Sequence, residues 1–171
     1  RVIGASYATE KRYVRYFDPA MKGLASALTE ALPGNPAIDI AGASSDESEL
    51  LVIAASDTDP GMLYLFDQNA KALNPLLPIR EETVGRTLAA MQPVTYTTSD
   101  GIQVPAYLTL PPGSDGKNLA AIVMPHGGPS ARDEWGFDWL VQFFAARGYA
   151  VLQPNFRGSA GYGANWFGEN G

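Results

Sequence analysis

Two glycine-rich segments, about thirty residues apart, carry the residue types with the clearest chemical potential. The first is segment 124–129 (Met-Pro-His-Gly-Gly-Pro), which follows the apolar run 119–123. The second is segment 155–163 (Asn-Phe-Arg-Gly-Ser-Ala-Gly-Tyr-Gly), which follows the apolar run 149–152. Open α/β sheets place their reactive groups in loops at the carboxyl ends of the strands. We therefore take these two loops as the candidate site.

The elements that must position the loops lie in the second half of the chain. Segments 94–98 and 102–110 are expected to pair as strands across a Ser-Asp-Gly turn. Residues 119–124 and 149–153 are expected to be buried strands, and apolar residues at helical spacing predict a helix between them that ends at Gly148. The order strand, loop, helix, strand predicts a parallel sheet covered on both faces. The apolar helix positions are Phe137, Leu140, Val141, Phe144 and Ala145.

The first half of the chain has a different pattern, with short strands separated by turns. A hairpin is expected from residues 2–7 and 13–17, and Asp18 followed by Pro19 is expected to open a helix. Met21, Leu24, Ala25, Leu28 and Leu32 would form the apolar face of that helix. Four strands in about forty residues match one blade of a β-propeller in size. Their predicted ranges are 37–41, 50–55, 62–66 and 72–77.

Composition narrows the classes of function. The chain has 171 residues, of which 46% are hydrophobic and 18% charged, which is typical of a globular protein. A net charge of −6 without a basic cluster argues against a nucleic acid or an anionic membrane as partner. The absence of cysteine excludes disulfides, thiolate metal sites and a cysteine nucleophile. Position 1 is Arg inside a strand-like run, so we expect an excised piece whose targeting signal, if any, lies upstream; cytoplasm and periplasm both stay open.

The two loops and their spacing resemble the start of the catalytic domain of the prolyl oligopeptidase family of serine peptidases. The acylaminoacyl-peptidase and dipeptidyl-peptidase branches are the most similar. The resemblance covers essentially the whole chain and implies an α/β class, in which an α/β-hydrolase sheet follows the blade strands of a β-propeller. Residues 1–82 would be the end of the propeller and residues 83–171 the start of the peptidase domain. It implies a peptide substrate, the remainder of a parent chain as partner, and neither a metal nor an organic cofactor.

The resemblance assigns Tyr162 as a side-chain donor to the oxyanion of the tetrahedral intermediate. A neutral donor that is fixed in advance stabilises that negative charge, and a phenol keeps its proton at neutral pH. Gly161 and Gly163 on either side allow a tight turn and leave room for substrate. The alternative is a tyrosine with a purely structural role in a glycine turn.

His126 is the only histidine of the chain, but we do not expect it to be the general base. Hydrolases with an α/β sheet place the base late, after the serine and the acid, whereas His126 follows the first buried parallel strand. The resemblance instead implies a loop-shaping role, with Gly127 and Gly128 letting the loop pass close to the nucleophile turn. Pro129 has no backbone N–H, which favours the tyrosine over a loop of backbone donors.

The nucleophile motif G-x-S-x-G is absent from the sequence. Ser6 lies in a near match that a strand follows, and Ser159 lacks the first glycine in register. We expect that no histidine serves either serine and that both are structural. We therefore expect none of the three catalytic residues, the nucleophile, the acid and the base, in this chain. The chain alone should be inactive, and its unpaired strands should make it self-associate, swap segments or persist only with the remainder of the parent.

Two other functions stay open at this point. One is an esterase or lipase of the α/β-hydrolase fold, and the other is a propeller module that binds a partner without catalysis. The blade-like strands favour a peptidase over a lipase, and the glycine loops at strand ends favour an enzyme over a binding module. Cleavage inside a peptide and cleavage near its end are both compatible with the sequence.

Overall fold

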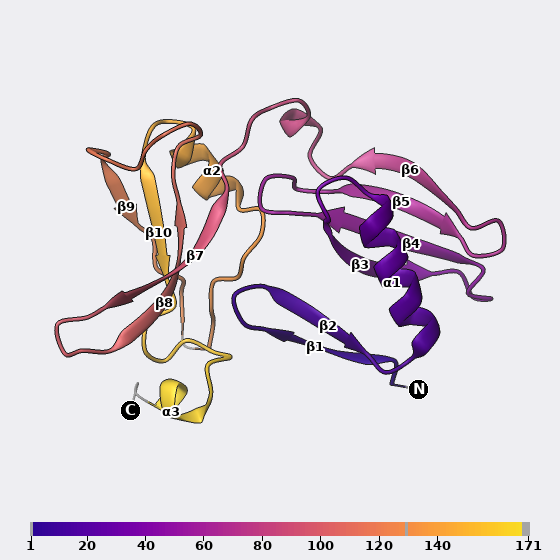
Figure 1. Cartoon of the computed structure of the whole chain (residues 1–171), viewed down its shortest axis with the longest axis horizontal. Coiled ribbons are helices and arrows are strands. Elements are labelled where there is room, and N and C mark those ends of the chain that lie inside the picture. The colour runs from indigo at the N-terminus through magenta and orange to yellow at the C-terminus, as the bar shows by residue number, and fades with distance from the viewer. Residues whose placement is uncertain (1, 129, 169–171) are drawn as a thin grey trace. The chain divides into compact units, whose positions relative to one another are not determined.

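A computed structural model describes residues 2–128 and 130–168 and divides the chain into two compact units. The first unit contains residues 1–5 and 15–86, and the second contains residues 6–14 and 87–171. Strands β1 (Gly4–Ala8) and β2 (Arg12–Tyr16) form the predicted hairpin, whose tip is counted with the second unit (Figure 1). The domain boundary at residues 82 and 83 stays a prediction.

The first unit is built on a four-stranded antiparallel sheet in the order β3-β4-β5-β6. All four predicted strands are present, with ends that differ by one or two residues because strand ends follow the pairing register. A register shift between Ile40 and Gly42 accompanies the longer course of β3. The strands are β3 (Ala37–Ala43), β4 (Glu49–Ala55), β5 (Met62–Asp67) and β6 (Ala72–Pro78).

Helix α1 (Pro19–Ala31) packs against this sheet through its predicted face. The Asp18 side chain accepts hydrogen bonds from the backbone N–H groups of Ala20 and Met21, as an N-terminal cap does. Leu28 lies in the core with Leu50, Val52 and Phe66. A short 3₁₀ helix, η1 (Glu81–Thr83), follows β6.

The second unit contains a four-stranded sheet in the order β7-β8-β10-β9 (Figure 1). The predicted hairpin of β7 (Met91–Thr97) and β8 (Gln103–Thr109) is confirmed. The prediction of a parallel sheet holds for one pair only. Strand β10 (Ala150–Pro154) is parallel to β9 (Ala121–Val123) but antiparallel to β8, so the described sheet is mixed.

The prediction that both apolar runs form buried strands is correct for β10 and wrong for β9. Val151 in β10 is fully buried because Thr109 and Ile122 flank it on the two neighbouring strands. Strand β9 has three residues and pairs on one side only within the described part of the chain, and Val123 is 64% exposed. An apolar run is thus not sufficient for burial, since burial also needs neighbours on both sides.

Helix α2 (Trp139–Ala145) connects β9 with β10 and confirms the predicted helix, although Phe137 precedes it. Asp138 caps it by accepting from the N–H groups of Leu140 and Val141, and Gly148 closes the turn after it with a φ of +89°. Helix α3 (Ala164–Phe167) was not predicted. Among the described helices, none has the length and apolar character needed to cross a bilayer.

Candidate active site

The two glycine loops leave the same edge of the second sheet because β9 and β10 are parallel. Pairing continues past β9, where the Met124 N–H donates to the Leu152 carbonyl at 2.8 Å. The Asn155 N–H donates to the Pro105 carbonyl at 2.8 Å directly after β10. The sequence correctly placed both loops together at strand ends.

Asn155 joins the second loop to the segment that follows the first. Its side chain is fully buried. Its Oδ1 accepts from the Asp133 N–H at 2.8 Å, and its Nδ2 donates to the Asp133 carbonyl at 3.0 Å. The same Nδ2 donates to the Tyr162 hydroxyl at 2.8 Å. Asn155 therefore has all its side-chain hydrogen-bonding capacity in use inside the site, apart from one acceptor lone pair.

The Tyr162 hydroxyl receives a second hydrogen bond, from Arg132 Nη2 at 3.0 Å. The guanidinium of Arg132 also lies over the tyrosine ring, 4.5 Å from its centroid. Burial raises the pKa of Tyr162 above its ordinary value, so the phenol keeps its proton at neutral pH. Two accepted bonds occupy the lone pairs of the oxygen, which leaves the O–H itself available as a donor.

His126 contacts Ser159, which corrects the expectation that no histidine serves this serine. His126 Nε2 lies 2.7 Å from Ser159 Oγ, and its ring stacks on Phe156 with the centroids 4.6 Å apart. Ser159 is fully buried, however, so a substrate cannot reach its hydroxyl in this arrangement. The sequence could not show this pair because it depends on how two loops meet in space.

Gly127 and Gly128 are exposed, and neither N–H has a hydrogen-bond partner among the described residues. Their N–H groups are therefore candidate donors to a ligand. Pro129, the remaining predicted member of this loop, lies outside the described residues. Gly161 and Gly163 both have positive φ values, +87° and +94°, which favour glycine.

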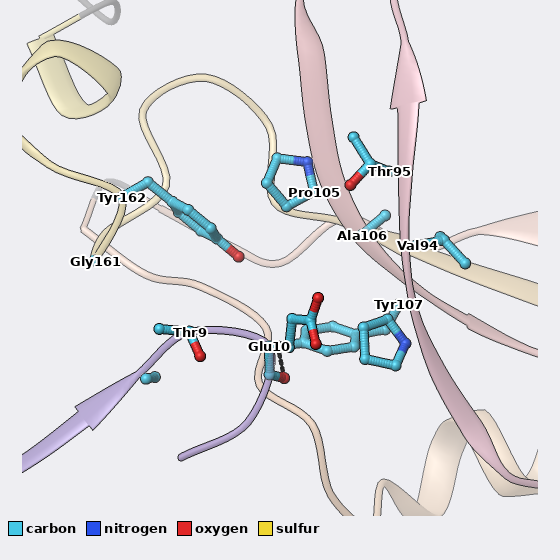
Figure 2. A pocket seen from close by; sticks show the side chains of 11 residues that line it. Thr9, Glu10, Val94, Thr95, Pro105, Ala106, Tyr107, Gly161 and Tyr162 are labelled. Atoms are coloured by element: carbon cyan, nitrogen blue, oxygen red, sulfur yellow. Dashed lines mark hydrogen bonds between the residues drawn. The ribbon is translucent and has the colours of Figure 1, made fainter. Parts of the chain in front are cut away.

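A pocket of about 370 Å³ lies between the hairpin tip, strands β7 and β8, and the second loop (Figure 2). The Tyr162 hydroxyl points into it. Glu10 is the one charged side chain among its lining residues. The Tyr107 hydroxyl donates to the Glu10 carbonyl at 2.8 Å and holds the tip against β8. The full lining is Ala8, Thr9, Glu10, Pro93, Val94, Thr95, Pro105, Ala106, Tyr107, Gly161 and Tyr162.

The cations around Glu10 are engaged with other groups. Lys11 lies over the Trp135 ring, 3.6 Å from its centroid, and Arg12 forms a two-pronged ion pair with Glu134. Arg132 donates to the Thr9 carbonyl at 2.9 Å. These contacts fix the hairpin tip and leave the Glu10 carboxylate without a cation among the described residues. Sequence reasoning missed Glu10 because the hairpin is remote from the loops along the chain.

Asp133 is the half-buried carboxyl of the site. Burial raises its pKa above the ordinary value. Its Oδ1 accepts from Gln153 Nε2 at 3.2 Å, and its Oδ2 is buried without a hydrogen-bond partner in the described part of the chain. Residues 2–128 and 130–168 contain no group of three His, Asp or Glu side chains arranged to bind a metal ion.

The sequence and structure of the chain are similar to those of known proteins. Residues 135–169 match the model of the prolyl oligopeptidase family. Dipeptidyl aminopeptidase BIII of Pseudoxanthomonas mexicana is 32% identical over 156 residues, which cover 87% of this chain and 22% of that protein. The Pyrococcus horikoshii acylaminoacyl peptidase structure is 25% identical with a TM-score of 0.54 and covers 75% of this chain and 20% of its own.

A Mycobacterium tuberculosis puromycin-hydrolyzing peptidase aligns over 96% of this chain and 26% of its own with a TM-score of 0.63; at 19% identity it shows the fold alone. The predicted fold class, an α/β-hydrolase sheet preceded by propeller strands, is confirmed by these likenesses. The chain spans about a fifth to a quarter of the length of these three proteins. On these matches the chain belongs to the prolyl oligopeptidase family.

Proposed function

We propose that this chain is part of a serine peptidase that cleaves short peptides by acyl transfer. The observation that carries the proposal is that two glycine loops lie together at the carboxyl ends of two parallel strands. The Tyr162 hydroxyl, which lines the pocket beside them, accepts two hydrogen bonds and keeps its own O–H available as a donor. The family match and the peptidase activity named for a relative support the same class of reaction.

In the proposed reaction a serine oxygen attacks the carbonyl carbon of the peptide bond, and the oxygen of that carbonyl becomes negatively charged. The amine then leaves with a proton supplied by a general acid, and water hydrolyses the acyl-serine ester. Ser159 is too deeply buried to be that serine, and Ser6 has no partner histidine. We assign the nucleophile, the acid and the base to no residue of this chain.

Tyr162 is our proposed oxyanion donor. Asn155 and Arg132 fix its oxygen from two sides, so the hydroxyl would need little reorganisation when charge develops. The exposed N–H groups of Gly127 and Gly128 are the alternative donors, and they belong to the loop after the edge strand β9. Replacing Tyr162 by phenylalanine in the active protein should lower kcat by roughly 10²–10³ if its hydroxyl binds the oxyanion.

The pocket supports a finer proposal, that the substrate enters with a free amino terminus. Its lining is mostly apolar, and its one charged side chain, Glu10, offers an unpaired carboxylate to a peptide ammonium. Such recognition would make the enzyme cleave near the amino end of its substrate. One relative carries the name dipeptidyl aminopeptidase, which is consistent with this mode.

The test uses the full-length protein that contains this segment. We expect hydrolysis of dipeptide p-nitroanilides with a free amino terminus, and much slower hydrolysis of the acetylated dipeptides and of p-nitrophenyl butyrate. Preference for the butyrate ester would support an esterase and overturn the peptidase proposal.

Glu10→Gln tests the finer proposal separately. It should raise KM for the free dipeptide about fivefold, the equivalent of about 1 kcal/mol for an exposed ion pair. The acetylated substrate should be unaffected. Glu30→Gln, on the exposed side of helix α1, is the matched control. Equal KM values for wild type and Glu10→Gln would remove Glu10 from substrate binding and leave the peptidase proposal in place.

A further inference from the structure

The contact between His126 and Ser159 joins the two glycine loops, although the two residues are 33 positions apart. Further contacts hold each of the two residues in place. The His126 ring stacks on Phe156 with an angle of 18° between the planes. The Ser159 N–H donates to the Phe156 carbonyl at 3.0 Å, and the next N–H, of Ala160, donates to the Ala131 carbonyl at 2.9 Å.

The surroundings of His126 decide which ring nitrogen carries the proton. Nδ1 lies 2.7 Å from the Gly127 carbonyl oxygen, which can only accept. The neutral ring must therefore carry its proton on Nδ1, which leaves Nε2 as acceptor for the Ser159 hydroxyl. One ring thus bonds to its own loop through Nδ1 and to the other loop through Nε2.

This pair lacks the features of a catalytic serine and histidine. Ser159 is fully buried, and the histidine is oriented by a backbone carbonyl rather than by a carboxylate. Gly127 and Gly128, which follow His126 in the first loop, are not buried like Ser159. They are exposed, and a Cβ at either position would meet no atom within 4 Å, so packing does not fix their backbone.

We propose that His126 is a positioning residue that locks the Gly127–Gly128 backbone to the second loop through Ser159. The ring supplies the restraint that packing does not, and it fixes the direction of the Gly127 and Gly128 N–H groups. The consequence for catalysis rests on the proposed peptidase function; the lock itself does not. Loss of the lock should leave substrate binding largely intact and lower the rate of the chemical step, because small misplacements of reacting groups are costly.

The first test measures the lock in the full-length protein with ¹⁵N-labelled histidine, where the signals of His126 are assigned by their loss in His126→Phe. In the uncharged form of the His126 ring, long-range ¹H–¹⁵N correlation should show the proton on Nδ1 only. Ser159→Ala should leave the proton on Nδ1, because the Gly127 carbonyl remains, but should shift the Nε2 signal and speed hydrogen exchange of the Gly127 and Gly128 amides. Ser114→Ala, which removes an exposed hydroxyl from the same unit, should change neither. A wild-type ring protonated on Nε2 would overturn the proposal.

The second test measures catalysis in the full-length protein. His126→Phe keeps a ring on Phe156 but loses both hydrogen bonds, and it should lower kcat about tenfold with KM within about twofold. His126→Gln, whose amide can accept from Ser159, should recover part of the loss. An unchanged kcat in His126→Phe would overturn the positioning role. A wild-type protein without peptidase activity would instead refute the proposed function and leave the NMR result standing.

Discussion

Replacing Tyr162 by phenylalanine removes one oxygen from the site and keeps the aromatic ring. That oxygen accepts hydrogen bonds from Asn155 Nδ2 at 2.8 Å and from Arg132 Nη2 at 3.0 Å. From sequence alone the substitution should leave folding nearly unaffected, because the ring and its packing remain. The structure argues against that expectation, since two donors would lose their acceptor.

The loss in the free energy of unfolding depends on which hydrogen bonds Asn155 and Arg132 retain in the variant. Asn155 Nδ2 retains its bond to the Asp133 carbonyl, and Arg132 Nη2 retains its bond to the Thr9 carbonyl. Asn155 is fully buried, so water cannot replace the lost partner, whereas Arg132 is only partly buried. A buried donor left without an acceptor costs about 1–3 kcal/mol, and we expect a loss of about 2 kcal/mol in the free energy of unfolding.

Urea unfolding followed by tryptophan fluorescence measures this loss in the relevant part of the chain. All three tryptophans, Trp135, Trp139 and Trp166, belong to the second unit, as does Tyr162. With a urea dependence of about 2 kcal/mol per molar, the midpoint should fall by about 1 M. Tyr149→Phe is the control, expected within about 0.5 kcal/mol of wild type. Equal midpoints for Tyr162→Phe and wild type would show that the hydroxyl holds neither donor.

Three further predictions concern other parts of the molecule. Gly161→Ala should destabilise the second unit by about 1 kcal/mol more than Gly163→Ala in the same urea assay. Both positions have positive φ, but only at Gly161 would the new Cβ lie 2.7 Å from a guanidinium nitrogen, and moving that group would weaken the bonds of Arg132 to Thr9 and Tyr162. Equal losses would contradict the contact. The Asp46 carboxyl accepts hydrogen bonds from two serine hydroxyls and should titrate by NMR at a pKa of about 2. Its contribution to stability is therefore present above the unfolded pKa of about 3.9 and is lost as the pH falls from about 4 to about 2. A pKa near the ordinary value would refute those hydrogen bonds. A double-mutant cycle on Arg12 and Glu134 should give a coupling of about 0.5–1 kcal/mol that shrinks in 1 M salt, and a salt-independent value would argue against an exposed ion pair.

The sequence predicted those elements whose signals are local. Asp18 and Pro19 fix the start of α1 through a cap and a first-turn proline, and the apolar run of residues 50–55 indicates the strand β4. The position of β9 could not be read in the same way. Its apolar run is typical of a buried strand, but the exposure of Val123 depends on which strands lie beside it. Self-association through this edge stays a prediction.

The site was predictable in outline and not in its contacts. Two glycine loops after apolar strands correctly indicated that residues 126–128 and 155–163 meet at one edge of a sheet. The hydrogen bond from Ser159 to His126 has no sequence signal, because each residue alone is unremarkable in its loop. Glu10 reaches the pocket only because a hairpin far away in the sequence lies against β8. Contacts of this kind depend on tertiary structure, which local patterns do not encode.

We propose that this chain supplies the loops of a serine peptidase and that the reactive serine lies elsewhere in the protein. Treating the active full-length protein with a fluorophosphonate and locating the label by peptide mass spectrometry tests it directly. We expect one stoichiometrically labelled serine outside residues 1–171, and loss of peptidase activity in step with labelling. A label on Ser159 or Ser6, with the same loss of activity, would contradict this assignment.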